Sequence, residues 1–119
     1  MRLRVVNESK NAILAERATE ATGFLERLVG LMGRRHLPPG EGLHIAPCNS
    51  IHTFFMRFPI DALFLDADGA IVKLLPSMPP WRASSLYFNA RSVLELPAGA
   101  AAASATVEGD RLRLERLAP

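Results

Sequence analysis

The sequence contains a single cysteine, Cys48, among its 119 residues. One cysteine cannot form an internal disulfide, so the chain is not a small secreted domain held together by disulfides, and a reducing compartment is compatible with it. The first seven residues lack the continuous apolar stretch of an export signal. No later run approaches the roughly 20 apolar residues that cross a bilayer. We therefore expect a cytoplasmic protein without a membrane span.

A strong charge is also missing, because the formal net charge is only +2 and charged residues make up 22% of the chain. The densest basic group, residues 34–36, suits the C-terminal end of a helix, where cations interact favourably with the helix dipole. A nucleic-acid interface needs a clustered basic surface, so we do not expect a nucleic-acid partner. The apolar fraction of 49% predicts one folded domain over residues 1–119.

Hydrophobic periodicity predicts strands at residues 3–6 and 12–19, joined by a polar turn. Between residues 22 and 33 the period changes to that of a helix, which we expect to be the principal helix of the fold. Its apolar stripe consists of Leu25, Leu28, Val29 and Met32. Gly30 lies within this segment and indicates either a close neighbour or an early end of the helix.

The stretch from residue 47 to residue 75 is predicted to supply the inner strands. Residues 51–56 alternate in a way that places apolar side chains on both faces, and Pro59 ends this pairing. A second strand follows at residues 60–66. The turn residues Ala67-Asp68-Gly69 then predict a hairpin with a strand at residues 71–75.

The remaining segments are shorter. A strand is predicted at residues 43–46, and the proline-rich residues 76–85 are predicted to form a long ordered loop or a lid. Residues 93–96 are typical of a strand that ends at a proline, and the alanines of residues 98–105 allow one or two helical turns. Residues 111–117 alternate as a half-exposed closing strand does.

Three segments carry a resemblance to a known family. They are residues 27–34 (Arg-Leu-Val-Gly-Leu-Met-Gly-Arg), the block 52–66 that begins His-Thr-Phe-Phe-Met-Arg-Phe-Pro, and residues 93–99 (Val-Leu-Glu-Leu-Pro-Ala-Gly). Together they resemble the DUF192 family, also called UPF0127, over nearly the whole chain. The resemblance implies a mostly β domain of the α+β type, an antiparallel β-sandwich or barrel-like structure with one principal α-helix packed across it. It implies no established activity.

His52 and Asp61 form the pair of side chains with the clearest chemical potential. If the segments on either side of Pro59 are neighbouring strands, the carboxylate could orient the imidazole for general-base catalysis. Structural roles compete with this interpretation. A histidine among apolar neighbours is usually satisfied by a backbone group or a carboxylate, and Asp61 could cap a turn or pair with Arg34 or Arg57.

A cleft around this pair could hold a small polar molecule or a peptide segment, with Trp81 as a residue that stacks on the ligand. The candidate ligand-binding residues are His52, Met56, Arg57, Asp61, Trp81 and Arg82. Arg34 and Glu95 are candidates for structural polar roles. Glu95 lies within an apolar strand, so it should find a donor such as Arg82 or Arg91, or form half of a polar pocket.

Cys48 suggests two further possibilities. With His52 it provides ligand types for a metal, but one cysteine and one or two histidines fall short of a closed zinc site, and we predict neither metal nor cofactor. With His52 or His44 it could act as a nucleophile, although a lone buried cysteine more often serves as a small apolar residue.

Three functional hypotheses follow. The first is a small soluble binding module with a cleft near His52 and Asp61. The second is an enzyme in which His52 is the general base and Arg34, Arg57 or Arg82 holds an anionic group. The third is a regulator that acts through a basic surface, which the scattered charge disfavours.

Overall fold

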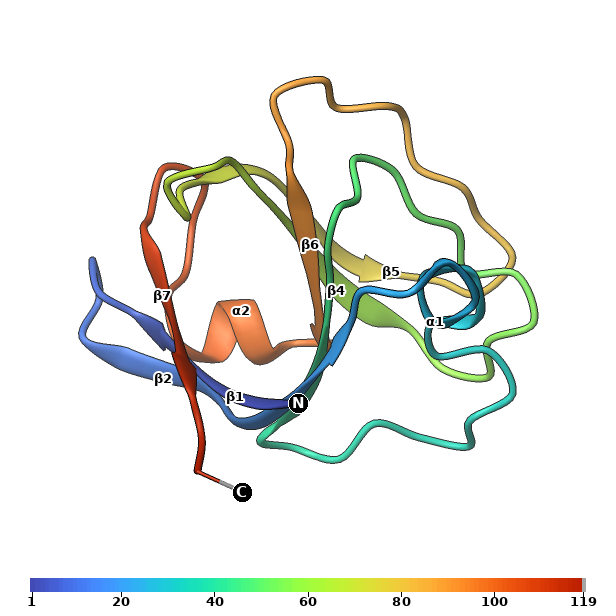
Figure 1. Ribbon diagram of the computed structural model, residues 1–119, viewed down its shortest axis with the longest axis horizontal. Helices are drawn as coiled ribbons and strands as arrows, with labels where there is room; N and C mark the ends of the chain where they lie inside the picture. Colours follow the sequence, from blue (N-terminus) through green and yellow to red (C-terminus); the bar gives the residue numbers. More distant parts are fainter. Residues whose placement is uncertain (119) are drawn as a thin grey trace.

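Seven strands form one strongly curled sheet in the computed structural model, which describes residues 1–118 (Figure 1). The strands are β1 (Arg2–Asn7), β2 (Ala12–Ala21), β3 (Glu41–Ile45), β4 (Ile60–Leu65), β5 (Ile71–Met78), β6 (Ser92–Pro97) and β7 (Leu112–Arg116). Their order across the sheet is β5-β4-β6-β3-β2-β1-β7. Neighbours are antiparallel except β2 and β3, which run parallel. The mostly β fold class is confirmed.

The sheet curls into a half-barrel because its two ends approach each other. An isolated bridge joins Ala70 to Arg111, and the backbone nitrogen of Leu112 donates to the carbonyl of Gly69 at 2.8 Å. Gly69 has a φ of 84°, and a Cβ atom there would lie 2.5 Å from the Leu112 carbonyl oxygen. The turn between β4 and β5 can therefore dock on β7 only because residue 69 is a glycine.

The central strands β4 and β6 are buried on both faces, so alternate residues enter two separate cores. Leu63 and Leu94 belong to the core shared with β1, β2 and β7. Phe64 and Val93 belong to a second core, which is covered by residues 46–59 and residues 79–91. Glu95 is on the same side of β6 as Val93 and therefore lies at the second core.

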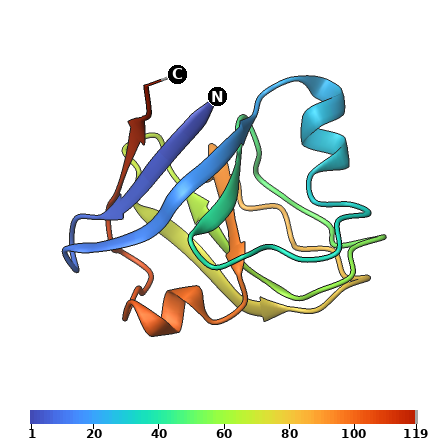
Figure 2. The same cartoon turned by 90° about the horizontal axis from the view of Figure 1, so that it is seen from below.

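The predicted principal helix is wrong in length and in packing. Helix α1 (Phe24–Val29) has six residues and ends at Gly30, whose φ is 51°, so the early end indicated by that glycine is confirmed. No residue of α1 is buried, and Leu25 is 70% exposed. Figure 2 shows α1 beyond the end of β2 rather than across the sheet. The apolar residue that anchors this region, Leu31, follows the helix.

The predicted strand at residues 51–56 is also wrong. This segment is a loop whose only ladder-like pairing within residues 1–118 is the bridge between His52 and Ala83. Its hydrogen bonds go to the segment 79–91 instead, since the backbone nitrogen of Thr53 donates to the carbonyl of Arg82 at 2.8 Å. Phe55 has a φ of 64°, which is incompatible with an extended strand.

The other predicted strands and the hairpin are confirmed, with two corrections: β5 is an edge strand of the sheet and not an inner one, and it extends to Met78, into the segment predicted to be a loop. The hairpin of β4 and β5 turns at residues 66–70, where the Asp66 carboxylate accepts backbone N–H groups from Asp68 and Ala70. Strand β5 continues through Pro76, which an edge strand tolerates. The alanine-rich segment forms α2 (Ala100–Ala103). In residues 1–118 we find no helix with the length and apolar character needed to cross a membrane.

Candidate functional site

Asp61 is 1% exposed, and its hydrogen bonds are to three backbone nitrogens rather than to His52. One carboxylate oxygen accepts from Ser77 at 2.8 Å, and the other accepts from Ala101 at 2.9 Å and from Gly99 at 3.2 Å. These bonds fix the end of β5 and the first turn of α2 to strand β4. The pattern is that of a structural carboxylate, but its partners differ from both roles predicted for this residue, a cap on the turn after Pro59-Ile60 and an ion pair with Arg34 or Arg57.

His52 belongs to a different environment. Its Nδ1 atom accepts a hydrogen bond from the backbone nitrogen of Phe54 at 3.1 Å, and its ring stacks on Phe54 with a centroid separation of 5.2 Å. Within residues 1–118, His52 and Asp61 share no hydrogen bond. The expected geometry, in which the Asp61 carboxylate orients the His52 imidazole, is therefore absent from the described residues.

Trp81 forms a surface cluster with two aromatic residues of the preceding loop. Its ring centroid lies 4.8 Å from that of Phe55 and 6.0 Å from that of Phe54. The neighbouring Arg82 is exposed, and its Nη1 donates to the carbonyl of Trp81 at 3.4 Å. Arg57 is exposed as well. These residues lie outside the lining of the main cavity.

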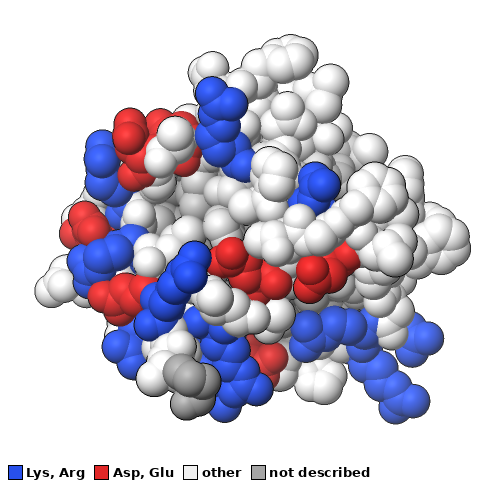
Figure 3. All heavy atoms as spheres, in the orientation of Figure 1, with Lys and Arg blue, Asp and Glu red and all other residues white. Residues whose placement is uncertain are grey.

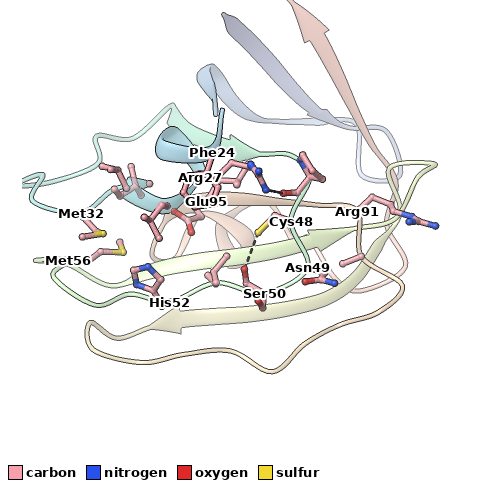
Figure 4. Close-up of a pocket in the computed structure, with 18 residues that line it drawn as sticks. Phe24, Arg27, Met32, Cys48, Asn49, Ser50, His52, Met56, Arg91 and Glu95 are labelled. Atoms are coloured by element: carbon pink, nitrogen blue, oxygen red, sulfur yellow. Dashed lines mark hydrogen bonds between the residues drawn. The ribbon is translucent and has the colours of Figure 1, made fainter. Parts of the chain in front are cut away.

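The main cavity has a volume of about 490 Å³ and lies between α1, the loop after β3 and the sheet (Figure 4). Of the six candidate ligand-binding residues, His52 and Met56 line it. The full lining consists of Phe24, Arg27, Leu28, Val29, Gly30, Leu31, Met32, Ile45, Pro47, Cys48, Asn49, Ser50, Ile51, His52, Met56, Ala90, Arg91 and Glu95. Three segments far apart in the sequence thus build one site.

Glu95 is the acid of this cavity. It lies at the middle of β6, opposite Leu43 of β3 and Ala62 of β4, and is only 3% exposed. Its carboxyl group points into the cavity (Figure 4) and has no hydrogen-bond donor within residues 1–118. Burial raises the pKa of Glu95 from 4.5 to about 8, so the group is mostly protonated at neutral pH.

Arg82 and Arg91, the donors expected for Glu95, do not contact it. The Arg91 side chain extends away from the cavity in Figure 4, and Arg82 bonds to its neighbouring backbone. Arg34, the other structural candidate, lies 3.7 Å from Glu41 in an exposed ion pair, which contributes little to stability. Glu95 is therefore a polar group without the partner that the sequence led us to expect.

Arg27 approaches the cavity from α1. Its Nη1 donates to the carbonyl of Pro47 at 3.1 Å, so the helix is tied to the loop that follows β3. Its Nε atom is buried without a hydrogen-bond partner in residues 1–118. Sequence reasoning did not select Arg27 as a site residue, and its position in the family-like segment 27–34 was the available signal.

Cys48 is a protonated thiol in this setting. Its Sγ donates to the carbonyl of Ser50 at 3.0 Å. Burial raises the pKa of the Cys48 thiol, and nearby Glu95 raises it further, whereas the Ser50 contact and Arg27 lower it. A thiol held protonated is a poor nucleophile, which argues against a catalytic Cys48.

His44, the other base considered for Cys48, is buried on strand β3 and is not part of the cavity lining. Its Nδ1 atom lies 3.9 Å from a Glu20 oxygen, and neither ring nitrogen has a hydrogen bond in residues 1–118. Burial lowers the pKa of His44, although Glu20 partly offsets this effect. Across the described chain, no three His, Cys, Asp or Glu side chains gather closely enough to hold a metal ion.

The fold and the cavity together define a class: a small, mostly β protein whose curled sheet carries a cavity with a buried acid. The chain belongs to the family of uncharacterized proteins DUF192, whose model matches residues 5–114. It is 32% identical to a UPF0127 protein of Pyrococcus horikoshii over 114 residues, covering 92% of this chain and 96% of that protein. It is 30% identical to a UPF0127 protein of Pyrococcus furiosus over 118 residues, covering 95% and 99%.

Two crystal structures share the fold. One is a protein of Sinorhizobium meliloti described as a "putative transcription regulator", with a TM-score of 0.80, 26% identity and coverage of 95% of this chain and 92% of that one. The other is a protein of unknown function from Novosphingobium aromaticivorans, with a TM-score of 0.81, 22% identity and coverage of 95% and 84%. The second likeness concerns the fold alone.

Proposed function

We propose that this protein is a small-molecule-binding module whose ligand occupies the cavity between α1 and the sheet. One observation carries the proposal: residue Glu95 is only 3% exposed, its carboxyl group faces the cavity, and it has no hydrogen-bond donor among residues 1–118. A buried polar group without a partner destabilises the folded protein. Unlike His44, whose ring is also unpartnered in residues 1–118, Glu95 faces a cavity in which a ligand can supply the missing partner.

The dimensions and the lining of the cavity support the same function. Its volume of about 490 Å³ lies within the range of roughly 300–1,000 Å³ that is typical of small-molecule sites. Apolar side chains such as Ile51, Met56 and Ala90 form much of the wall, and polar side chains such as Asn49 and Ser50 form the rest. This combination is common in sites that bind a compact organic molecule in one orientation.

The enzyme hypothesis has weaker support. Asp61 is saturated by three backbone N–H groups, and His52 accepts from the backbone, so no oriented general base results. The regulator hypothesis would need a continuous basic surface. On the face shown in Figure 3, Lys and Arg side chains are interspersed with Asp and Glu over its left half. The likeness to the Sinorhizobium meliloti protein keeps DNA binding as an outcome to be tested, with salt dependence as its signature.

A fragment screen observed by NMR tests the proposed function. We expect the bound fragments to shift the signals of Ile45, Ile51, Met56 and Ala90. The variant Val29→Trp should abolish these shifts, because residue 29 lines the cavity yet is 48% exposed and so tolerates a larger side chain. Val107→Trp is the matched control, since Val107 is 52% exposed and outside the lining. Fragments that bind Val29→Trp as well as the native protein would refute the proposal.

The predicted cytoplasmic location is part of the proposal. The free thiol of Cys48 supports it, since a reducing compartment preserves such a thiol. Cell fractionation with an antibody against the protein tests this prediction.

A further inference from the structure

We infer that the cavity recognises a compact organic cation, a protonated or alkylated amine whose charged nitrogen lies against the Glu95 carboxyl oxygens, and this inference rests on the proposed function. The carboxyl group is the deepest ionisable group of the lining, on the central strand β6. A protonated amine supplies both things that this group lacks, a hydrogen-bond donor and a compensating charge, whereas a quaternary ammonium group supplies the charge alone.

The surroundings of Glu95 show which charges a ligand would meet. Its cross-strand neighbours Leu43 and Ala62 are apolar. Cys48 and His52 face the cavity from the loop after β3. His44 pairs with Leu94 across the strands, so its side chain points to the opposite face of the sheet. The remaining charged residues of the lining are Arg27 and Arg91.

Neither arginine offers an equivalent site for an anion. Arg91 extends away from the cavity (Figure 4). The Arg27 guanidinium donates from Nη1 to the Pro47 carbonyl and its Nε is buried in the protein, so part of its donor capacity is already used or covered. Glu95, by contrast, makes no hydrogen bond among residues 1–118 and points its carboxyl group into the cavity. An anionic ligand would have to share the cavity with Glu95, which repels it once ionised.

The rest of the lining suits a small cation with alkyl substituents. The thioethers of Met32 and Met56 both line the cavity (Figure 4), and polarizable sulfur packs well against alkyl groups. Phe24 stands at the helix wall and is 72% exposed, which leaves its ring free to cover a bound ammonium group. The site thus combines one acid with thioether and aromatic groups on part of its wall.

Proton balance gives this inference a specific signature. Because the pKa of Glu95 is about 8, a cation that binds at neutral pH displaces the carboxyl proton into solvent. Affinity should therefore rise about tenfold between pH 6 and pH 7 and level off above pH 8. At pH 7, nearly one proton should leave per ligand, which calorimetry detects as a dependence of the binding heat on the buffer. The variant Glu95→Gln tests whether this pH dependence comes from Glu95.

Four probes of similar size test the inference by NMR titration of the full chain at pH 6, 7 and 8. They are n-butylamine, tetramethylammonium, neutral 1-butanol and anionic butyrate. We expect the two cations to bind at least tenfold more tightly than the other two probes at pH 8. Glu95→Gln should weaken cation binding at least tenfold and remove most of its pH dependence. Glu16→Gln, which removes an exposed carboxylate and changes the net charge equally, should behave like the native protein.

The variant Glu95→Asp controls for a loss of binding that is caused only by disturbed folding. It keeps the acid but withdraws it by one methylene, so cations should bind more weakly while their pH dependence persists. Equal binding of n-butylamine by the native protein and Glu95→Gln would overturn the inference, as would no binding of either cation. Equal binding of butylamine and butanol, with both lost in Val29→Trp, would refute cation recognition while leaving the proposed function intact.

Discussion

Replacing Glu95 by glutamine should stabilise the ligand-free protein, and the gain should grow with pH. The carboxyl group is buried without a partner, and burial raises its pKa from 4.5 to about 8. Glutamine has nearly the same shape as the protonated acid but never ionises. At a pH where the unfolded chain has lost this proton, the native protein must keep it in order to fold, which costs free energy. The substitution removes this cost and leaves the packing of β6 almost unchanged.

The magnitude follows from proton linkage. Between pH 4.5 and pH 8 the unfolded chain has lost the Glu95 proton while the folded protein retains it. The stabilising effect of this proton is fully present below pH 4.5 and is lost as the pH rises through about 8. Each pH unit in this window corresponds to about 1.4 kcal/mol. Glu95→Gln should thus gain roughly 3 kcal/mol at pH 7 and roughly 4 to 5 kcal/mol at pH 8, a large share of the total stability of a small protein.

Urea denaturation followed by far-UV circular dichroism at pH 5, 6, 7 and 8 measures this effect. Subtracting the native free energy of unfolding from that of Glu95→Gln cancels the contributions of all other titrating groups, including His44. The difference should rise steadily with pH, whereas Glu16→Gln should give a flat difference near zero because residue 16 is exposed. A pH-independent difference for Glu95→Gln would show that the acid is already ionised or already partnered in the folded protein.

Three further substitutions test other parts of the structure by the same denaturation experiment. Asp61→Ala leaves three backbone N–H groups without their acceptor and should cost roughly 3 kcal/mol; a loss below about 1 kcal/mol would contradict its structural role. His44→Leu should stabilise by about 1 kcal/mol at pH 7, and by more as the pH falls through 6.5, because burial lowers the pKa of His44 and the native protein loses stability there. Gly69→Ala should cost roughly 3 kcal/mol because its Cβ would meet the Leu112 carbonyl, whereas Gly109→Ala, with a similar φ and open space, should cost only about 1 kcal/mol.

The strands could be predicted where turn residues and the alternation of apolar side chains indicate the same element. The Asp68-Gly69 turn between two apolar runs specified the β4–β5 hairpin, and the alternation after residue 110 specified β7. Residues 51–56 show where this reasoning fails. Their apolar alternation is real, but the hydrogen-bond partners are supplied by residues 79–91, a loop that local pattern cannot pair with them. Periodicity reports which side chains are apolar, not which backbone lies beside them.

The candidate site was predicted in part. The sequence indicated that Glu95 needed a partner, because an acid within an apolar strand is expensive to bury. It could not indicate that the partner is missing, since the cavity is assembled from α1, the loop after β3 and β6, which meet only in the folded chain. The pairing of His52 with Asp61 assumed that both flank a strand break on one sheet. Instead Asp61 lies within β4 and bonds to α2, whereas His52 lies in the loop that borders the cavity.

Two features that oppose stability occur at the same place. Glu95 is buried without a donor, and α1 presents apolar side chains such as Leu28 and Val29 to the cavity or to solvent instead of packing them into a core. Elsewhere in residues 1–118 the buried acids Asp61 and Asp110 are hydrogen-bonded. A sequence shaped for stability alone would place a neutral residue at position 95 and close the helix onto β6. The unpartnered acid and the exposed apolar side chains of α1 border the same cavity. This is the arrangement that a ligand site requires, because the ligand then supplies the missing charge and covers the exposed apolar surface.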